Sequence, residues 1–398
     1  MLKAIKQPFA DVIAFSKFAK SKCMSKLPKV GTTIFTIMSQ MANEYQAINL
    51  SQGFPNFPVD HQLIDIFKSK VDENIHQYAP MGGNPKLLGE LSRLTLEQYG
   101  RSVHPSDEIL VTAGATQAIF TAIQALVNKG EEVVILDPSY DCYEPPIVLT
   151  GGVPVHVQMA EDFLPDWQKI REAVNKNTKM MIINNPHNPS GRVWRDEDYV
   201  ALEELMNDHP QLLLLSDEVY EYITFEKRHR SVNSMGSIRD RSIIVSSFGK
   251  TFHITGWKMG YMIAPQTLMK EIKKVHQFLV FCVNSVAQEV LAEYLRKIDV
   301  SKLGSFYQQK RDLFRSLMSG SRFELLPSEG SYFQVASFKS ISDELDTEFA
   351  KRMVIEHGLA SIPLSVFNDS RLDQKLIRFC FAKDDETLTK AAEKLCTI

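Results

Sequence analysis

The sequence predicts an α/β protein in which a mostly parallel sheet, flanked by helices, forms a large domain beside a smaller α+β domain. Two observations lead to this fold class. From about residue 108, short apolar runs alternate with helical patterns, and Gly, Pro, Asn or Asp bounds each run. Beyond about residue 290, the pattern changes to longer helices and strand-like segments of antiparallel type, among them residues 329–333 and 376–381. A chain of 398 residues has room for about two or three folding units.

The expected strands of the large domain are short apolar runs. They are residues 108–112, 132–136, 153–157, 179–183, 212–215 and 242–245. Residues 115–127, between the first two runs, have a helical pattern, which gives a strand–helix–strand unit. Runs that are apolar throughout are typical of strands buried on both faces, as in a parallel sheet covered by helices.

The two expected domains are interleaved along the chain. We expect residues 60–295 to form the large domain, and residues 26–59 with 296–398 to form the small one. Residues 1–25 mix lysines with phenylalanines, a pattern that fits an amphipathic helix, a transit-like peptide or a loosely ordered extension. An internal start near Met24 is a further hypothesis for this segment.

The composition is that of a globular protein whose partners are small molecules. Hydrophobic residues make up 44% and charged residues 23%, and the net charge is −3, without the basic stripe that nucleic acid or an anionic membrane would require. The five cysteines are scattered and form no Cys-x-x-Cys pair, so we expect neither disulfides nor a metal site, and a cytoplasmic location. No apolar run approaches the roughly 20 residues of a membrane-spanning helix.

Polar motifs follow the expected strands, at the point where each strand ends. They are residues 112–116, 137–140, 184–189, 217–220 and 246–250. Ligands of open α/β sheets bind outside the carboxyl ends of the strands, so these motifs are expected to converge on one site.

Lys250 follows the last expected strand among small residues, which would let a cofactor approach closely. This placement suits a lysine that forms a Schiff base, provided that burial or a neighbouring charge removes its proton. Lys258 would supply a second cation for a phosphate group, and Ser247 a hydrogen-bond donor. A lysine considered alone is more often a solvated surface residue.

Asp217 ends an apolar run, where a buried aspartate is costly unless a cation pairs with it. The protonated ring nitrogen of a pyridine cofactor would be such a cation. Tyr220 and Asn188 could both reach an oxygen on the same ring. Taken singly, Asp217 also fits a helix cap, Tyr220 a core aromatic and Asn188 a turn residue.

Gly114, Ala115 and Thr116 lie where an expected strand turns into a helix. Backbone N–H groups at the start of a helix bind phosphate readily, so these three residues are candidates for a phosphate site. Tyr140 follows the next strand and could stack on a cofactor ring, although an aromatic residue there is more often core packing.

Arg378 lies on an apolar segment, a costly position unless its guanidinium binds a carboxylate. The α-carboxylate of a substrate and a structural Asp or Glu are both candidates for that carboxylate. The backbone of Gly53 could approach the same group.

Together these motifs resemble the class I/II aminotransferases, which depend on pyridoxal phosphate (PLP) and have the PLP-dependent transferase fold type I. The resemblance runs from about Lys26 to the C-terminus and is most specific to the methionine and kynurenine aminotransferase group. The matching segments are residues 31–35, 48–55, 77–81, 185–189 and 246–260. The fold that this resemblance implies has a mostly parallel sheet of seven strands.

The resemblance also implies a role for each candidate residue. Lys250 would be the Schiff-base lysine and proton shuttle, with Asp217 at the ring nitrogen, and Tyr220 and Asn188 at the 3-oxygen. Arg378 would bind the carboxylate of the substrate. A homodimer is implied, in which Tyr78 reaches the phosphate in the neighbouring subunit and Phe281 lines the neighbour's substrate pocket.

Two departures from the wider family bear on the substrate. Many relatives have an arginine at the phosphate where this chain has Lys258. The kynurenine group tolerates lysine at this position. Residues 275–288 hold no second arginine of the kind that dicarboxylate-specific relatives use, and offer Phe278, Phe281 and His276 instead. We therefore expect an apolar, sulfur-containing or aromatic amino-acid donor, methionine first, then phenylalanine, tyrosine, glutamine and kynurenine, with a 2-oxo acid as acceptor in a ping-pong reaction.

Three alternatives stay open from the sequence. A carbon–sulfur β-lyase would use the same cofactor and lysine, because the fold does not fix which bond breaks. A transcriptional regulator with an aminotransferase-like domain would need a DNA-binding domain, and the segment before Lys26 is too short to hold one. A catalytically inactive paralogue is disfavoured, because the expected cofactor-binding residues are all present.

Overall fold

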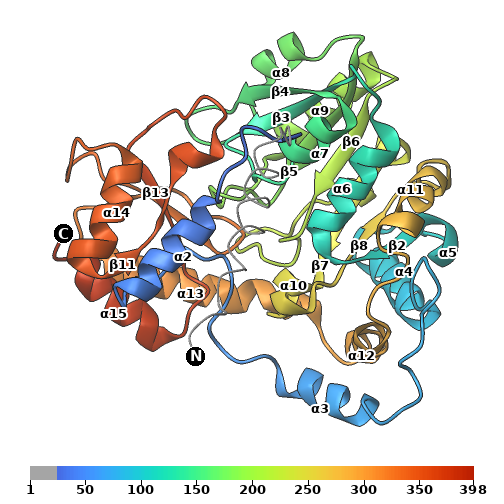
Figure 1. The fold of residues 1–398 in the computed structure, drawn as a ribbon, viewed down its shortest axis with the longest axis horizontal. Helices are drawn as coiled ribbons and strands as arrows, with labels where there is room; N and C mark the ends of the chain where they lie inside the picture. The colour runs from blue at the N-terminus through green and yellow to red at the C-terminus, as the bar shows by residue number, and fades with distance from the viewer. Residues whose placement is uncertain (1–24) are drawn as a thin grey trace, which may run out of the picture.

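The computed structural model describes residues 25–398 (Figure 1). The expectations for residues 1–24 therefore lie outside the described residues. Within the described part of the chain, no helix combines the length and the apolar character that crossing a membrane requires.

A mostly parallel sheet of seven strands forms the centre of the molecule, as the resemblance implied. In spatial order its strands are β2 (Ile109–Thr112), β8 (Gly260–Ile263), β7 (Ser242–Ser247), β6 (Leu213–Asp217), β5 (Thr178–Asn184), β3 (Glu132–Asp137) and β4 (Val153–Gln158). Only β8 is antiparallel to its neighbours, β2 and β7. The six apolar runs are all strands, as predicted. The sequence did not single out β8, because four residues that begin with glycine are too short for a periodicity to emerge.

Helices cover both faces of this sheet. They are α3 (His61–Lys70), α4 (Pro85–Tyr99), α5 (Pro105–Glu108), α6 (Gly114–Leu126), α7 (Glu144–Thr150), α8 (Trp167–Ala173), α9 (Asp196–Asp208), α10 (Phe248–Thr251), α11 (Gln266–Leu279) and α12 (Ser285–Leu295). Ile243 and Val245 of β7 belong to a core cluster with side chains of α6 and α11. Ile244, between them, belongs to a cluster with side chains of α8 and α9. Because neighbouring side chains of a strand point to opposite faces, both faces need apolar residues, which explains the unbroken apolar runs.

A second group of elements packs beside the large sheet and contains a small antiparallel sheet of order β12–β13–β10–β9. The strands are β9 (Glu324–Leu325), β10 (Phe333–Ser337), β12 (Ile362–Pro363) and β13 (Leu376–Cys380), with β1 (Ile48–Asn49) and β11 (Leu359–Ala360) as a separate parallel pair. Its helices are α2 (Ile34–Glu44), α13 (Leu303–Leu317), α14 (Asp346–His357) and α15 (Asp385–Leu395). The described residues also form six 3-10 turns: η1 (Val232–Ser234), η2 (Arg239–Arg241), η3 (Thr255–Trp257), η4 (Val300–Lys302), η5 (Met318–Gly320) and η6 (Leu364–Phe367).

The N-terminal helix α2 lies among C-terminal elements, far from it in sequence (Figure 1). Met38 and Ala42 of α2 share a core cluster with Ala350 and Val354 of α14. Helix α2 therefore packs against elements of the C-terminal part of the chain. The exact division into residues 26–59 with 296–398 and residues 60–295 stays a prediction.

One strand begins later than the sequence suggested. Residues 329–333 had the pattern of a strand, but β10 begins only at Phe333. Gly330 instead forms a single bridge with Thr224. A Cβ added at Gly330 would lie 2.9 Å from the carbonyl oxygen of Ile223, so only glycine allows the chain to pass this close.

Candidate active site

A cavity of about 330 Å³ lies at the carboxyl ends of the parallel strands. Among its lining residues, Asn184, Asp217 and Ser247 end β5, β6 and β7. The expected cofactor and substrate residues that line it are Gly53, Gly114, Ala115, Thr116, Tyr140, Asn188, Asp217, Tyr220, Ser247, Lys250, Lys258 and Arg378. The strand-end motifs therefore do converge on one place, where open α/β sheets bind their ligands.

Lys250 lies on the short helix α10, which follows β7 directly. Burial lowers the pKa of its ammonium group to about 8. Its Nζ donates a 3.1 Å hydrogen bond to the carbonyl oxygen of Gly53, and lies 5.9 Å and 5.8 Å from the ring centres of Tyr220 and Tyr332. With this pKa, Lys250 has an unprotonated fraction near neutral pH, which a nucleophilic or proton-transferring amine requires.

Asp217 is 3% exposed at the end of β6. Its Oδ2 accepts a 2.6 Å hydrogen bond from the hydroxyl of Tyr143, while Oδ1 accepts only a long one of 3.4 Å from the backbone N–H of Val219. Burial raises the pKa of this carboxyl to about 6. A buried carboxylate with spare acceptor capacity and no ion pair among the described residues fits a site for a cationic ring nitrogen.

Groups that bind anions gather at the start of α6. A Cβ added at Gly114 would lie 3.5 Å from Nζ of Lys258, so the lysine reaches the N-terminal end of the helix. Ala115, Thr116 and Ser247 line the same cavity. A cation, a hydroxyl group and the first N–H groups of a 13-residue helix together suit a phosphate.

Arg378, on β13, is 1% exposed and points into the cavity. Nη1 donates to Oδ1 of Asn188 at 2.6 Å and Nη2 to the carbonyl oxygen of Ser51 at 3.1 Å, while Nε has no partner among residues 25–398. Its Cζ lies 3.9 Å from the ring centre of Phe333. Because no described Asp or Glu forms an ion pair with this guanidinium, the structural ion pair is ruled out within the described chain, and the cation is free for a ligand carboxylate.

Asn188 and Tyr220 occupy the remaining walls of the cavity. The backbone N–H of Asn188 donates to Oδ1 of Asn184 at 2.8 Å, which fixes the turn after β5. Tyr220 is 2% exposed, with its ring 5.2 Å from that of Tyr332.

The backbone of Gly53 lies so close to Phe333 that a Cβ added at Gly53 would be 2.9 Å from Cζ of Phe333. Its carbonyl oxygen accepts from Lys250 and Tyr332.

Tyr78 and Phe281 do not line the cavity of their own chain. Tyr78 is 81% exposed and Phe281 is 45% exposed, and their rings pack edge to face at 5.3 Å. Within one chain these two residues are therefore not part of the site.

The sequence missed several residues that belong to the cavity. Phe35, Gln52, Phe54 and Phe333 line it, and Tyr143 holds Asp217. Tyr143 lies three residues after Tyr140, just beyond the strand-end segment 137–140, and this proximity was the only signal for it. Phe35 and Phe333 come from segments that the sequence treated as small-domain packing.

The chain belongs to the class I and II aminotransferases, whose family model matches residues 45–395. It is 45% identical over 375 residues to the methionine aminotransferase of Escherichia coli K12, which covers 93% of this chain and 97% of that protein. It is 31% identical over 407 residues to a kynurenine–oxoglutarate transaminase of Dictyostelium discoideum, covering 92% of this chain and 94% of that protein.

Solved structures agree with this membership. A crystal structure of an Escherichia coli protein with a methionine aminotransferase function superposes with a TM-score of 0.92 at 45% identity, and covers 95% of this chain and all of that one. N-succinyldiaminopimelate aminotransferase of Mycobacterium tuberculosis superposes with a TM-score of 0.90 at 32% identity, covering 94% of this chain and 100% of that one. The chain is therefore an aminotransferase with the fold that the sequence predicted.

Proposed function

We propose that this aminotransferase uses pyridoxal phosphate and takes methionine as its first-choice amino donor. The observation that carries the proposal is the convergence of Lys250, Asp217 and Arg378 on one cavity of about 330 Å³. They provide an amine of lowered pKa, a buried carboxyl group and a buried guanidinium, and the last two form no ion pair with any other described residue.

The cavity fits the cofactor at three points. Lys250 would bond to it, Asp217 would hold its ring nitrogen, and the start of α6 with Ser247 and Lys258 would hold its phosphate. When bound, pyridoxal phosphate withdraws electrons from the α-carbon of the substrate and so eases the loss of its proton.

The remaining steps belong to side chains of this chain. Arg378 binds the α-carboxylate of the amino acid through its guanidinium, which orients the α-carbon toward Lys250. The amine of Lys250, whose pKa is about 8, would accept the proton of the α-carbon at its Nζ and pass it on within the site. Tyr220 and Asn188, which line the same cavity, would bind the 3-oxygen of the ring.

The wall of the cavity supports an apolar or sulfur-containing donor. Phe35, Phe54 and Phe333 line it, and among its lining residues the only cations are Lys250, Lys258 and Arg378. Those three already have assignments at the cofactor or at the α-carboxylate. A second carboxylate on the substrate would therefore find no further cation among the described residues that line the cavity.

We also propose that the protein is a homodimer in which Tyr78 and Phe281 complete the neighbour's site. Tyr78, Phe278 and Phe281 are 81%, 86% and 45% exposed, and such a gathering of exposed aromatic side chains is typical of an interface. Light scattering at micromolar concentration should give twice the 45.2 kDa mass of one chain. A monomer that is fully active would refute the shared site. The cytoplasmic location stays a prediction.

A screen of amino donors against several 2-oxo acids tests the donor assignment. We expect methionine to give the highest kcat/KM, with phenylalanine, tyrosine, glutamine and kynurenine below it and aspartate far below. Parallel double-reciprocal lines would show the ping-pong order. Preference for aspartate would refute the assignment, and pyruvate formed from cystathionine without an acceptor would identify a β-lyase instead.

Lys250→Ala tests the attachment of the cofactor. The variant should lose the visible absorbance of lysine-bonded cofactor and lose turnover by at least about a hundredfold, the lower range for a positioned acid–base group. Added methylamine should restore part of the turnover. An active variant that lacks this absorbance would refute the role of Lys250.

A further inference from the structure

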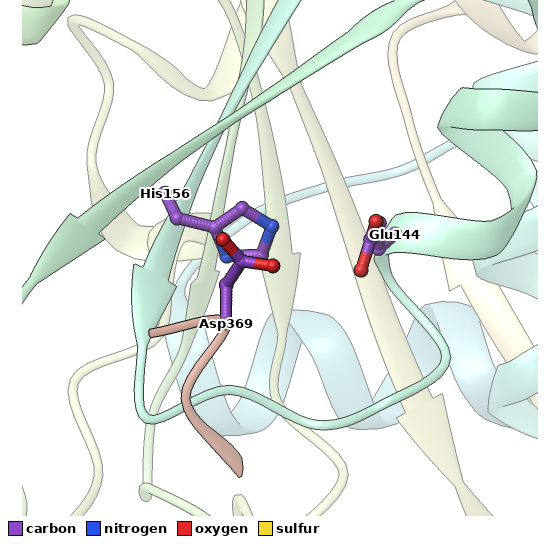
Figure 2. Close-up of side chains that lie close together, drawn as sticks. All are labelled: Glu144, His156 and Asp369. Carbon is purple, nitrogen blue, oxygen red and sulfur yellow. The ribbon is translucent and has the colours of Figure 1, made fainter. Parts of the chain in front are cut away.

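A second cluster of ligand-type side chains lies at the edge of the large sheet and takes no part in the aminotransferase site. It consists of Glu144, His156 and Asp369, shown in Figure 2, and one possible ligand atom from each residue lies within 4.8 Å of the others. The three come from the start of α7, from β4 and from the segment after η6. None of them lines the active-site cavity.

The imidazole of His156 is oriented by a buried carboxylate. Its Nδ1 lies 3.1 Å and 3.0 Å from the two carboxylate oxygens of Asp137, which is 3% exposed. Its Nε2 is buried and has no hydrogen-bond partner among residues 25–398. Figure 2 shows the free ring nitrogen turned toward Glu144. A carboxylate that fixes one nitrogen while the other stays available is the usual arrangement around a metal-bound histidine.

The charges of the cluster call for a cation. Glu144 and Asp369 form no ion pair with Lys or Arg in the described part of the chain, and Asp137 pairs only with His156. Three carboxylates therefore surround one imidazole. The backbone N–H of Asp369 donates to Oδ2 of Asp137 at 2.9 Å, which holds the exposed Asp369 in the cluster.

We propose that Glu144, His156 and Asp369 bind a divalent first-row transition-metal ion, with Asp137 fixing the histidine behind it. One imidazole nitrogen with two carboxylates suits zinc or manganese, whereas magnesium and calcium take oxygen ligands and copper(I) takes sulfur. Water would complete the coordination on the exposed side. The sequence predicted no metal site because Glu144 and His156 are separated from Asp369 by more than half of the chain.

The bound ion would connect two parts of the fold. Glu144 and His156 belong to the large sheet and its helices, while Asp369 follows η6 beside the small sheet. A 2.7 Å hydrogen bond from the N–H of Ser139 to the carbonyl oxygen of Phe367 crosses the same boundary. Tyr140, which lines the active site, lies between Asp137 and Glu144 in sequence. The ion would therefore stabilise the contact between these two parts of the fold, next to the wall of the cavity that Tyr140 lines.

Calorimetric titration of zinc sulfate into the cofactor-loaded, chelator-treated protein, in buffer free of phosphate, tests the proposal. We expect one saturable site per chain and no comparable site for magnesium. Asp369→Asn and Glu144→Gln should each weaken zinc binding at least about tenfold, and His156→Gln should abolish it. Glu161→Gln, which removes an exposed carboxylate outside the cluster, should leave the affinity unchanged.

Two further measurements distinguish loss of the metal site from damage to the fold. The variants should keep the cofactor absorbance and the metal-free melting temperature, because Asp369 is exposed and Glu144 half-buried. Zinc at one fixed concentration should raise the melting temperature of the parent chain more than that of Asp369→Asn. Absence of saturable binding, or equal affinity in Asp369→Asn and Glu161→Gln, would overturn the proposal, whatever the amino donor proves to be.

Discussion

The hydroxyl of Tyr143 donates a 2.6 Å hydrogen bond to Oδ2 of Asp217, and both side chains are at most 3% exposed. This bond lowers the pKa of the Asp217 carboxyl and opposes the larger effect of burial, which raises it. Tyr143 thus helps to keep Asp217 ionised, the state in which it can pair with a protonated ring nitrogen.

Tyr143→Phe should therefore weaken the cofactor site while leaving the fold intact. We expect about a tenfold loss in cofactor affinity, since a hydrogen bond to a charged group is worth roughly 1.5–3 kcal/mol. The acidic limb of the kcat/KM profile should also move to higher pH, because the pKa of Asp217 rises. Tyr45→Phe, at an exposed tyrosine, is the control. An unchanged pH profile would contradict the positioning role of Tyr143.

Arg378→Lys keeps a positive charge but removes the planar fork of the guanidinium. We expect kcat/KM to fall about a hundredfold for every amino donor, because each carries the same α-carboxylate. Assays with methionine and with phenylalanine check this. A loss confined to one donor would mean that Arg378 contacts the side chain of the substrate instead.

The pKa of Asp217 also predicts how stability depends on pH in the cofactor-free chain. Its folded value of about 6 lies above the ordinary value of 3.8, so the folded state binds the proton more tightly than the unfolded state does. This contribution to stability is fully present below pH 3.8 and is lost as the pH rises through about 6. The loss amounts to about 3 kcal/mol.

Asp217→Asn should remove that loss. The free energy of unfolding of the variant, relative to that of the parent, should increase between pH 4 and pH 7 by about 3 kcal/mol. Urea unfolding at several pH values, without cofactor, measures this difference. If the free energies of unfolding of the two proteins change with pH in parallel, the pKa of Asp217 is not raised by burial.

Much of the fold and of the site could be predicted from local patterns. The strand runs stood out because both faces of the sheet are covered, and Lys250 and Asp217 stood out because they directly follow such runs. Tyr143 and Phe35 did not, because their roles depend on contacts with residues distant in sequence. The cluster of His156 and Asp369 was invisible for the same reason, since more than half of the chain lies between these two residues.

Gly256, in η3, and Gly260, the first residue of β8, offer a matched test of close packing beside the phosphate site. A Cβ at Gly260 would lie 2.8 Å from the carbonyl oxygen of Ser246 and 3.0 Å from the backbone nitrogen of Ala115, both of them backbone atoms that cannot easily move. A Cβ at Gly256 would meet nothing within 4 Å. Of the two substitutions by alanine, only Gly260→Ala should disturb the start of α6.

Gly260→Ala should therefore lower the free energy of unfolding by about 1–3 kcal/mol, the usual cost of overpacking, and should weaken cofactor retention. Gly256→Ala should change stability by no more than about 0.5 kcal/mol, as expected of an open position. Urea unfolding and dialysis against cofactor-free buffer measure the two effects. If both variants retain the cofactor equally well, the approach of Gly260 to Ala115 is not what shapes the phosphate site, and the anion must depend on Lys258 and Ser247 alone.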